Sequence, residues 1–243
     1  MGFTFAEYSI TIIDESMTTS KYSFTLNSDL YIKDPTSSVT GRKVIASGAK
    51  LILENGIEAF TAKKLATEAG ITEATVYKYF ANKQRLLQYY FQLYWTWLEQ
   101  QVKVFTAIET DPLQSLVKAV RVISNIPSVA ADPGVITKYD LRELVINEGS
   151  KAYYHAQVDE DNAKRFFAPY KSITALLANM ILAVKPDEKY PLALATTIIE
   201  MSHSLKYYAK HLPALTDFPH ETDQVKLDDF LLQLLYNSLK IKP

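Results

Sequence analysis

Residues 61–87 constrain the fold most, because they predict two short amphipathic helices separated by a tight turn. Thr61 can cap the first helix, and Gly70 supplies the left-handed residue that ends it. Thr72 can cap the second helix, whose apolar residues at four-residue spacing point toward the same core. The outer face of that second helix is left free, which favours its insertion into the major groove of DNA.

Helical periodicity continues through most of the chain. A first helix is expected from Thr40 to the stop at Asn55-Gly56, and Asn82 can cap a long helix that meets no Gly or Pro until Pro112. Later helices are expected at about 113–125, 134–148, 159–184, 188–211 and 223–240, separated by Pro and Gly. No strand-turn alternation interrupts them, so the sequence predicts an all-α fold.

Charge is distributed unevenly along the chain, although the formal net charge is only −1. Residues 40–86 carry eight Lys and Arg against four Glu, a net charge of +4, which leaves −5 for the remainder. This distribution is expected when one end of a protein approaches phosphate groups and the other does not.

Three segments follow from these patterns. Residues 1–38 are rich in Ser and Thr and alternate aromatic residues without a nearby strand partner, so we expect a flexible or loosely packed extension. Residues 39–86 are expected to form a three-helix, helix-turn-helix domain, and residues 87–243 a larger helical domain. With 48% hydrophobic residues, the chain has enough apolar surface for both cores.

The outward face of the second helix is predicted by elimination. Val76 and Phe80 point inward, at four-residue spacing. The residues then expected to face outward are Thr72, Glu73, Thr75, Lys78 and Tyr79. Short polar side chains there can contact base edges, and a Lys or Tyr can reach either a base or a phosphate.

The run TAKKLATEAGITEATVYKYFANKQRLL resembles the DNA-binding signature of the TetR family of transcriptional regulators. The matching positions are Thr61, Leu65-Ala66, Ala69-Gly70, the Thr-x-Tyr-x-Tyr-Phe run from Thr75 to Phe80, and Lys83. The resemblance covers roughly residues 40–90 and implies that four side chains contact DNA backbone or bases: Thr61, Tyr77, Tyr79 and Lys83.

Two residues of the predicted recognition helix depart from the family pattern. Ala74 stands where Gly is frequent, and Glu73 stands where a basic residue or Ser is frequent. A carboxylate at position 73 would repel phosphate but can accept a hydrogen bond from a cytosine amino group. We therefore expect an operator that differs from the commoner ones.

The resemblance also implies the architecture and regulation of the whole protein. It implies a C-terminal ligand-binding and dimerisation domain, with a homodimer formed by the last two long helices, here about 188–211 and 223–240. Two recognition helices would then contact a palindromic DNA operator with half-sites about 34–36 Å apart. An unknown small-molecule effector would control a repressor. Protein–protein interaction, or ligand binding without operator recognition, stays open as the alternative.

Aromatic residues supply the candidates for an effector site, since 16 Tyr and 11 Phe lie mostly in the C-terminal two thirds of the chain. The candidates are Trp95, Tyr139, Phe167, Tyr170, His203 and Tyr207. His203 and Tyr207 are the best pair, because four-residue spacing places both on one helix face. Plain core packing with a satisfied histidine stays open as the other interpretation.

Several functions are disfavoured by missing motifs. The sequence has no phosphate-binding Gly loop, no Gly-x-Ser-x-Gly turn and no His-Glu-x-x-His helix, so we expect no enzyme. It has no Cys and no His-carboxylate set at ligand spacing, so we expect neither a metal site nor a cofactor. Without a secretion signal or a long apolar run, a cytoplasmic protein that contacts no membrane is expected.

Overall fold

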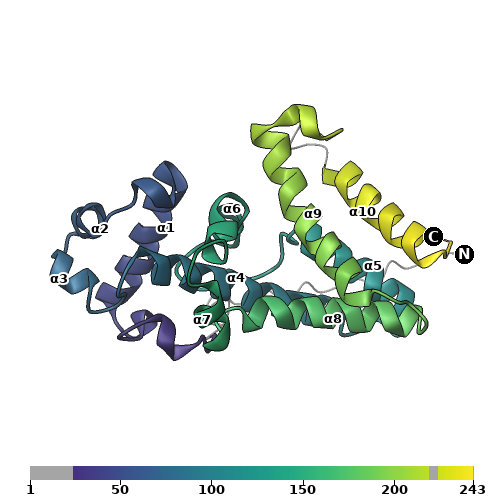
Figure 1. Cartoon of the computed structure of the whole chain (residues 1–243), viewed down its shortest axis with the longest axis horizontal. Coiled ribbons are helices and arrows are strands. Elements are labelled where there is room, and N and C mark those ends of the chain that lie inside the picture. The colour runs from purple at the N-terminus through teal and green to yellow at the C-terminus, as the bar shows by residue number, and fades with distance from the viewer. Residues whose placement is uncertain (1–23, 219–223, 243) are drawn as a thin grey trace, which may run out of the picture.

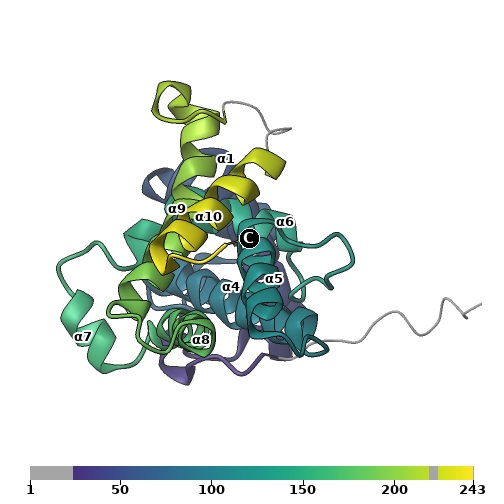
Figure 2. The same ribbon diagram turned by 90° about the vertical axis from the view of Figure 1, so that its right-hand side faces the viewer.

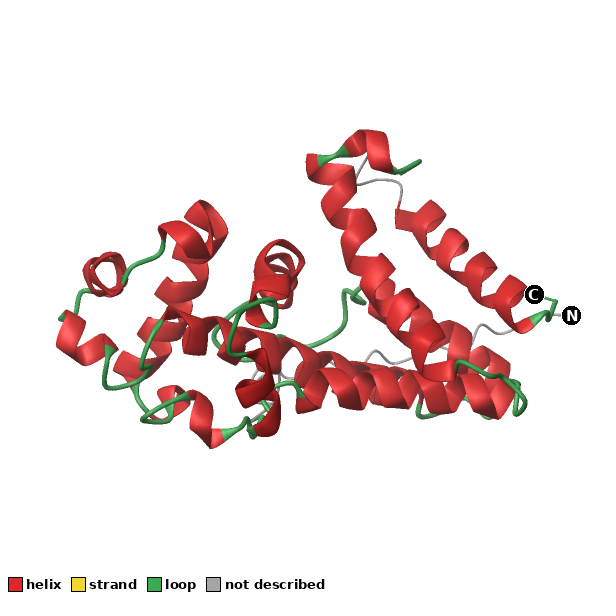
Figure 3. Ribbon diagram, viewed as in Figure 1, coloured by secondary structure: helices red, strands yellow, loops and turns green. Residues whose placement is uncertain are grey.

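The computed structural model describes residues 24–218 and 224–242. Within these ranges it consists of helices and loops, with no strand (Figure 3), which confirms the predicted fold class. The α-helices are α1 Val39–Ala59, α2 Ala62–Ala69, α3 Glu73–Val76, α4 Lys83–Thr106, α5 Pro112–Ser124, α6 Lys138–Glu148, α7 Val158–Ala163, α8 Ala168–Val184, α9 Pro191–His211 and α10 Gln224–Leu239. Short 3-10 helices are η2 Ser28–Leu30, η3 Pro35–Ser37, η4 Gly149–Ala152 and η5 Pro213–Leu215. None of the helices in the described ranges is both long and apolar enough to cross a bilayer.

The molecule is elongated, with α1, α2 and α3 at one end and α8, α9 and α10 toward the other (Figure 1). Helix α4 runs between the two ends and contacts α1 as well as α5, α6 and α8. In the view along the long axis, α5, α6 and α8 lie around α4 (Figure 2). The predicted long connecting helix is therefore present, and it continues without a break across the expected boundary at residue 86.

Side-chain caps define where α2, α3 and α4 begin. Thr61, Thr72 and Asn82 each accept a hydrogen bond from the backbone N–H three residues later, at 3.2, 3.2 and 2.9 Å. Gly70 ends α2 in the left-handed conformation, with φ 66° and ψ 40°. All four residues play the structural part that the sequence predicts, and each side-chain cap contributes about 1 kcal/mol.

Residues 24–38 pack on the helical body, so the expectation of a flexible or loosely packed extension is wrong for them. The backbone N–H of Asn27 donates to the side chain of Gln92 in α4 at 3.0 Å, and that of Ile32 donates to the carbonyl of Tyr79 at 2.8 Å. Leu26 and Leu30 are buried in the core. These contacts come from distant residues, which a local pattern cannot reveal. Residues 1–23 of the predicted extension lie outside the described residues.

The single helix expected at 159–184 is two helices, α7 and α8. Between them Arg165 has a φ of 63°, a left-handed conformation that interrupts a right-handed helix. Pro169 occupies the first turn of α8, where its missing N–H and fixed φ favour a helix start. Phe166 and Phe167, which lie in the break between the two helices, are both buried.

Candidate nucleic-acid interface and ligand cavities

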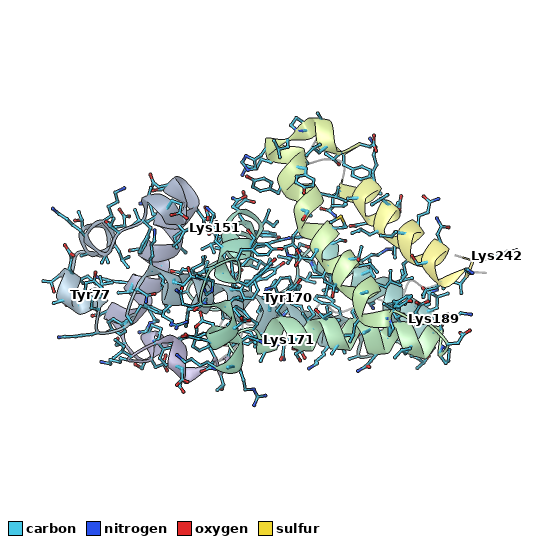
Figure 4. The ribbon with its side chains drawn as sticks, in the orientation of Figure 1. Tyr77, Lys151, Tyr170, Lys171, Lys189 and Lys242 are labelled. Carbon is cyan, nitrogen blue, oxygen red and sulfur yellow. The ribbon has the colours of Figure 1, made fainter. Side chains whose placement is uncertain are left out.

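The turn before α3 and the residues after it form an exposed polar surface at one end of the molecule. Its exposed residues are Thr72, Glu73, Tyr77 and Lys78. Tyr77 is 49% exposed and lies at the far left of the molecule in Figure 4. Val76 and Phe80 are buried beneath this surface, as predicted. Thr75 is only half-buried, and its hydroxyl lies 2.9 Å from that of Thr72.

Tyr79 does not face outward, and the prediction of its orientation is wrong. It is 4% exposed, and its hydroxyl lies 2.8 Å from Oγ of Ser38, the residue that caps α1. The reason is local: the chain stays helical beyond Val76, since the N–H of Phe80 donates to the carbonyl of Val76 at 3.2 Å, and a residue three positions after Val76 lies on the same buried face as Phe80. Through this contact Tyr79 holds the end of residues 72–80, which we call the recognition segment, against the start of α1.

Three of the four residues that the TetR resemblance implies as DNA contacts lie together. Thr61, Tyr77 and Lys83 all border one depression of about 280 Å³ between α2, α3 and α4. The ammonium of Lys83 donates to the carbonyl of Ile57 at 3.1 Å and lies 3.6 Å from the carboxylate of Glu58. Its side chain is still 43% exposed, so it can reach a phosphate near the end of α1.

Further cations surround this end of the molecule. The exposed ones are Arg42, Lys43, Lys63, Lys64 and Lys78. Arg42 donates to the carbonyl of Thr36 at 2.7 Å, and Lys64 donates to that of Ala59 at 2.8 Å. A cation held by a carbonyl keeps its full charge, so the basic end predicted from the sequence can attract phosphate.

A cavity of about 570 Å³ is lined by residues of α1, α4, α6 and α9, and we call it the junction cavity. Helix α1 contributes Ile52, Leu53 and Gly56 to its wall. Its other lining residues include Phe91 and Trp95 of α4, residues 145–151 and Tyr153, and Glu200, His203 and Tyr207 of α9. Three of the predicted ligand-site residues, Trp95, His203 and Tyr207, therefore lie on one cavity.

The other predicted ligand-site residues take different positions. Tyr170 lies beside the junction cavity, because its ring centroid is 4.4 Å from that of Trp95. Phe167 is buried in the core and does not line the cavity. Tyr139 is 56% exposed and borders a second cavity. The structure thus does not bring Phe167 and Tyr139 into one site with the other four residues.

His203 has both ring nitrogens satisfied. Nε2 lies 2.7 Å from the hydroxyl of Tyr94, and Nδ1 lies 2.9 Å from the carbonyl of Ile199. Burial, followed by the nearby Arg142, lowers the pKa of His203 to about 3. The ring is therefore neutral at physiological pH, with Nδ1–H donating and Nε2 accepting. It forms a wall of the junction cavity and offers no free polar atom in its plane.

The second cavity, of about 620 Å³, lies between α5, α6, α9 and α10 and is basic. Arg142, Lys206 and Lys210 line it, together with Glu143, which forms an ion pair with Lys210. Arg142 is 7% exposed and donates to the carbonyl of Ser124. Burial and the charge of Arg142 lower the pKa of Lys206 to about 7. Tyr207 lines both cavities, as do Ile146 and Asn147, so the two cavities are neighbours.

Glu200 lines the junction cavity but is not among the predicted site residues. Glu200 is the only acidic residue of α9, and it stands directly after Ile198 and Ile199, three residues before His203. An isolated acid in an otherwise apolar stretch of a helix is a signal that could have identified it.

Comparison with known proteins agrees with this geometry. Residues 44–90 match the family model described as bacterial regulatory proteins, tetR family. No protein with a curated description shows significant similarity to the sequence. The matched range contains α2, α3 and the implied contacts Thr61, Tyr77 and Lys83, so the chain carries a TetR-type helix-turn-helix domain.

Solved structures share the fold over most of the chain. The fatty acid degradation regulator FadR from Bacillus halodurans has a TM-score of 0.61 and 19% identity, covering 84% of this chain and 98% of its own. AibR, solved in complex with isovaleryl coenzyme A and operator DNA, has a TM-score of 0.57 and 13% identity, covering 83% and 100%. The superantigen PfiT has a TM-score of 0.57 and 14% identity, covering 86% and 100%. The protein thus has the fold of TetR-family transcriptional regulators, as the sequence predicts.

Proposed function

We propose that this protein is a DNA-binding transcriptional regulator that binds a palindromic operator as a homodimer and responds to a small molecule. The observation that carries the proposal is the exposed recognition surface on a TetR-type domain, with Thr61, Tyr77 and Lys83 around one depression. Basic residues surround that surface, which suits a phosphate backbone. Residues 39–86 would be the DNA-binding domain, and residues 87–243 the ligand-binding and dimerisation domain.

We assign separate tasks to the residues of the interface. Thr72, Glu73, Thr75 and Lys78 would face base edges in the major groove, whereas Thr61, Tyr77 and Lys83 would hold the backbone. Tyr79 is a positioning residue in this proposal, because its buried ring and its bond to Ser38 fix the turn after α3.

Helices α9 and α10 supply the surface for the homodimer. Eight of their apolar residues are buried within the chain: Ala195, Ile198, Ile199, Leu227, Leu231, Leu232, Leu235 and Leu239. Leu192 and Phe230 remain 57% and 42% exposed, and Leu194 and Leu234 are half-buried. A second copy of α9 and α10 would cover these residues, and two-fold symmetry would then place two recognition segments on one face of DNA.

The effector site that we propose is the junction cavity. Because α1 forms one of its walls, an occupant touches the DNA-binding end of the chain as well as α4, α6 and α9. A ligand that fits one arrangement of α1 better than another shifts the population of DNA-competent dimers. The AibR complex, which holds both a ligand and operator DNA, supports this use of the fold. Repression, relieved by the ligand, is the direction that we propose.

The alternative function is protein–protein interaction without operator binding. The likeness to PfiT, described as a superantigen, indicates that the fold alone does not decide between the two. The exposed recognition surface and the cations around it favour DNA.

The proposal is tested by measuring the affinity for duplex DNA as a function of salt for three variants. Tyr77→Ala and Lys83→Ala should weaken binding to all sequences, and Lys83→Ala should reduce the salt slope by about 0.9, the value for one lost phosphate contact. Lys189→Ala removes one exposed cation at the opposite end of the molecule (Figure 4) and should bind as the wild type does. Unchanged affinity in both interface variants, with unchanged helical circular dichroism, would falsify the assigned interface.

A further inference from the structure

The junction cavity contains a carboxylate that no cation of the described residues neutralises. Glu200, half-buried on α9, accepts hydrogen bonds from the hydroxyls of Tyr153, at 3.4 Å, and Tyr170. The other acid on the cavity wall, Glu148, pairs with Lys151 at 2.8 Å. No Lys or Arg within residues 24–218 and 224–242 forms an ion pair with Glu200. One negative charge of the cavity is therefore held by neutral groups alone.

Aromatic rings surround this carboxylate. The ring of Tyr170 packs against Trp95 with centroids 4.4 Å apart and lies nearly parallel to that of Tyr153, with centroids 6.3 Å apart. Phe91 contacts both Trp95 and Tyr153, with centroids 5.8 and 5.7 Å away. The faces of such rings carry partial negative charge and attract cations. Carboxylate and rings therefore favour the same kind of ligand.

The charged side chains that line the second cavity are mainly cations, in contrast to the unpaired carboxylate of the junction cavity. Arg142 and Lys206 line that cavity, and neither lines the junction cavity. An anionic ligand is attracted to the second cavity and repelled by the unpaired carboxylate of Glu200. The two neighbouring cavities therefore distinguish ligands by the sign of their charge.

We infer that the junction cavity binds an organic cation: an amine or quaternary ammonium group with an apolar or aromatic body. The charged group lies next to Glu200 and the neighbouring rings. The cavity volume of about 570 Å³ suits a drug-sized molecule. The inference rests on the proposed function only in naming this ligand as the effector; the binding itself does not depend on DNA.

Titration calorimetry with three probes of similar size tests the inference: 4-phenylbutyltrimethylammonium, uncharged 4-phenylbutanol and anionic 4-phenylbutanoate. The cation should bind the full chain about tenfold more tightly than the alcohol, and the anion more weakly than either in this cavity. Glu200→Gln keeps the hydrogen bonds to the tyrosines possible and removes the charge, so it should abolish the preference. Asp187→Asn removes an exposed charge outside the cavity lining and should leave the preference intact.

The outcomes separate the inference from the proposed function. Failure of the cation to bind, equal binding of cation and alcohol, or a preference that survives Glu200→Gln would overturn the inference. Cation binding that leaves DNA affinity unchanged would keep the cation site but remove its role as effector site. Cation binding by a protein that does not bind DNA would overturn the proposed function and leave the cation site standing.

Discussion

Replacement of Asp161 by Asn is the most informative perturbation of the connection between α6 and α8. Asp161 is 2% exposed, and its two carboxylate oxygens lie 2.7 Å from Nη1 of Arg85 and 2.6 Å from Nε2 of Gln88. Both partners lie in the first turns of α4, next to the DNA-binding end. The neighbouring Gln84 donates to the carbonyls of Lys151 and Ala152. These bonds hold the segment that forms part of the wall of the junction cavity.

The expected loss in the free energy of unfolding is about 2–3 kcal/mol. Asn presents an NH₂ group where one carboxylate oxygen was, so either Arg85 or Gln88 faces a donor instead of an acceptor. A hydrogen bond to a charged group contributes about 1.5–3 kcal/mol. Removal of one partner from a fully buried ion pair costs about 3–5 kcal/mol. The Arg85 side chain is 21% exposed, so water recovers part of that cost and the expected value lies below this range.

Urea unfolding followed by circular dichroism measures the change directly. The matched control is Asp159→Asn, since Asp159 is exposed on the same helix α7 and its substitution should change stability by less than about 0.5 kcal/mol. A loss for Asp161→Asn no larger than that of the control would refute the reasoning, because it would mean that the network around Asp161 does not hold the connection to α4.

Three further predictions concern single residues. Gly56→Ala should destabilise the protein by about 1–3 kcal/mol in thermal unfolding, because Gly56 has φ 74° and ψ 161° and its added Cβ would lie 3.0 Å from Oε1 of Glu148. Gly70→Ala, at φ 66° with nothing within 4 Å of the added Cβ, should destabilise it less. A larger loss for Gly70→Ala than for Gly56→Ala would contradict the strain argument. Tyr79→Phe should lower stability by about 1 kcal/mol through the lost bond to Ser38 and leave the salt slope of DNA binding unchanged, whereas a reduced slope would show that Tyr79 contacts phosphate. The folded protein keeps His203 neutral down to about pH 3, whereas the unfolded chain protonates it near pH 6.5. The contribution of His203 to stability is therefore present above about pH 6.5 and is lost at up to about 1.4 kcal/mol per pH unit as pH falls toward 3. His203→Gln should lose less stability in acid, and parallel curves of stability against pH for the two proteins would disprove this.

The sequence predicts the DNA-binding end well because the signals there are local. Caps at Thr61, Thr72 and Asn82 and the left-handed Gly70 each act within a few residues, so their spacing alone defines α2, α3 and the start of α4. The failure at Tyr79 is local as well, because the prediction uses only the four-residue spacing of Val76 and Phe80, whereas the residue three positions after Val76 lies on the same helix face.

The ligand cavities depend on contacts that local patterns do not contain. Glu200 of α9, Tyr170 of α8 and Trp95 of α4 become neighbours only when three helices pack together, and neither propensity nor spacing within one helix brings them together. The packing of residues 24–38 on α4 is equally non-local. Aromatic composition leaves open whether these residues line a core or a pocket, and tertiary structure decides which of them border a cavity.

Selection of bound sequences from random duplex DNA, with the mass of the protein determined in solution, tests the central claim most directly. We expect a dimer that enriches a palindrome with half-sites about 34–36 Å apart, and a weaker enrichment with Tyr77→Ala. A folded protein that enriches no sequence would contradict the regulator assignment and favour the protein-interaction alternative.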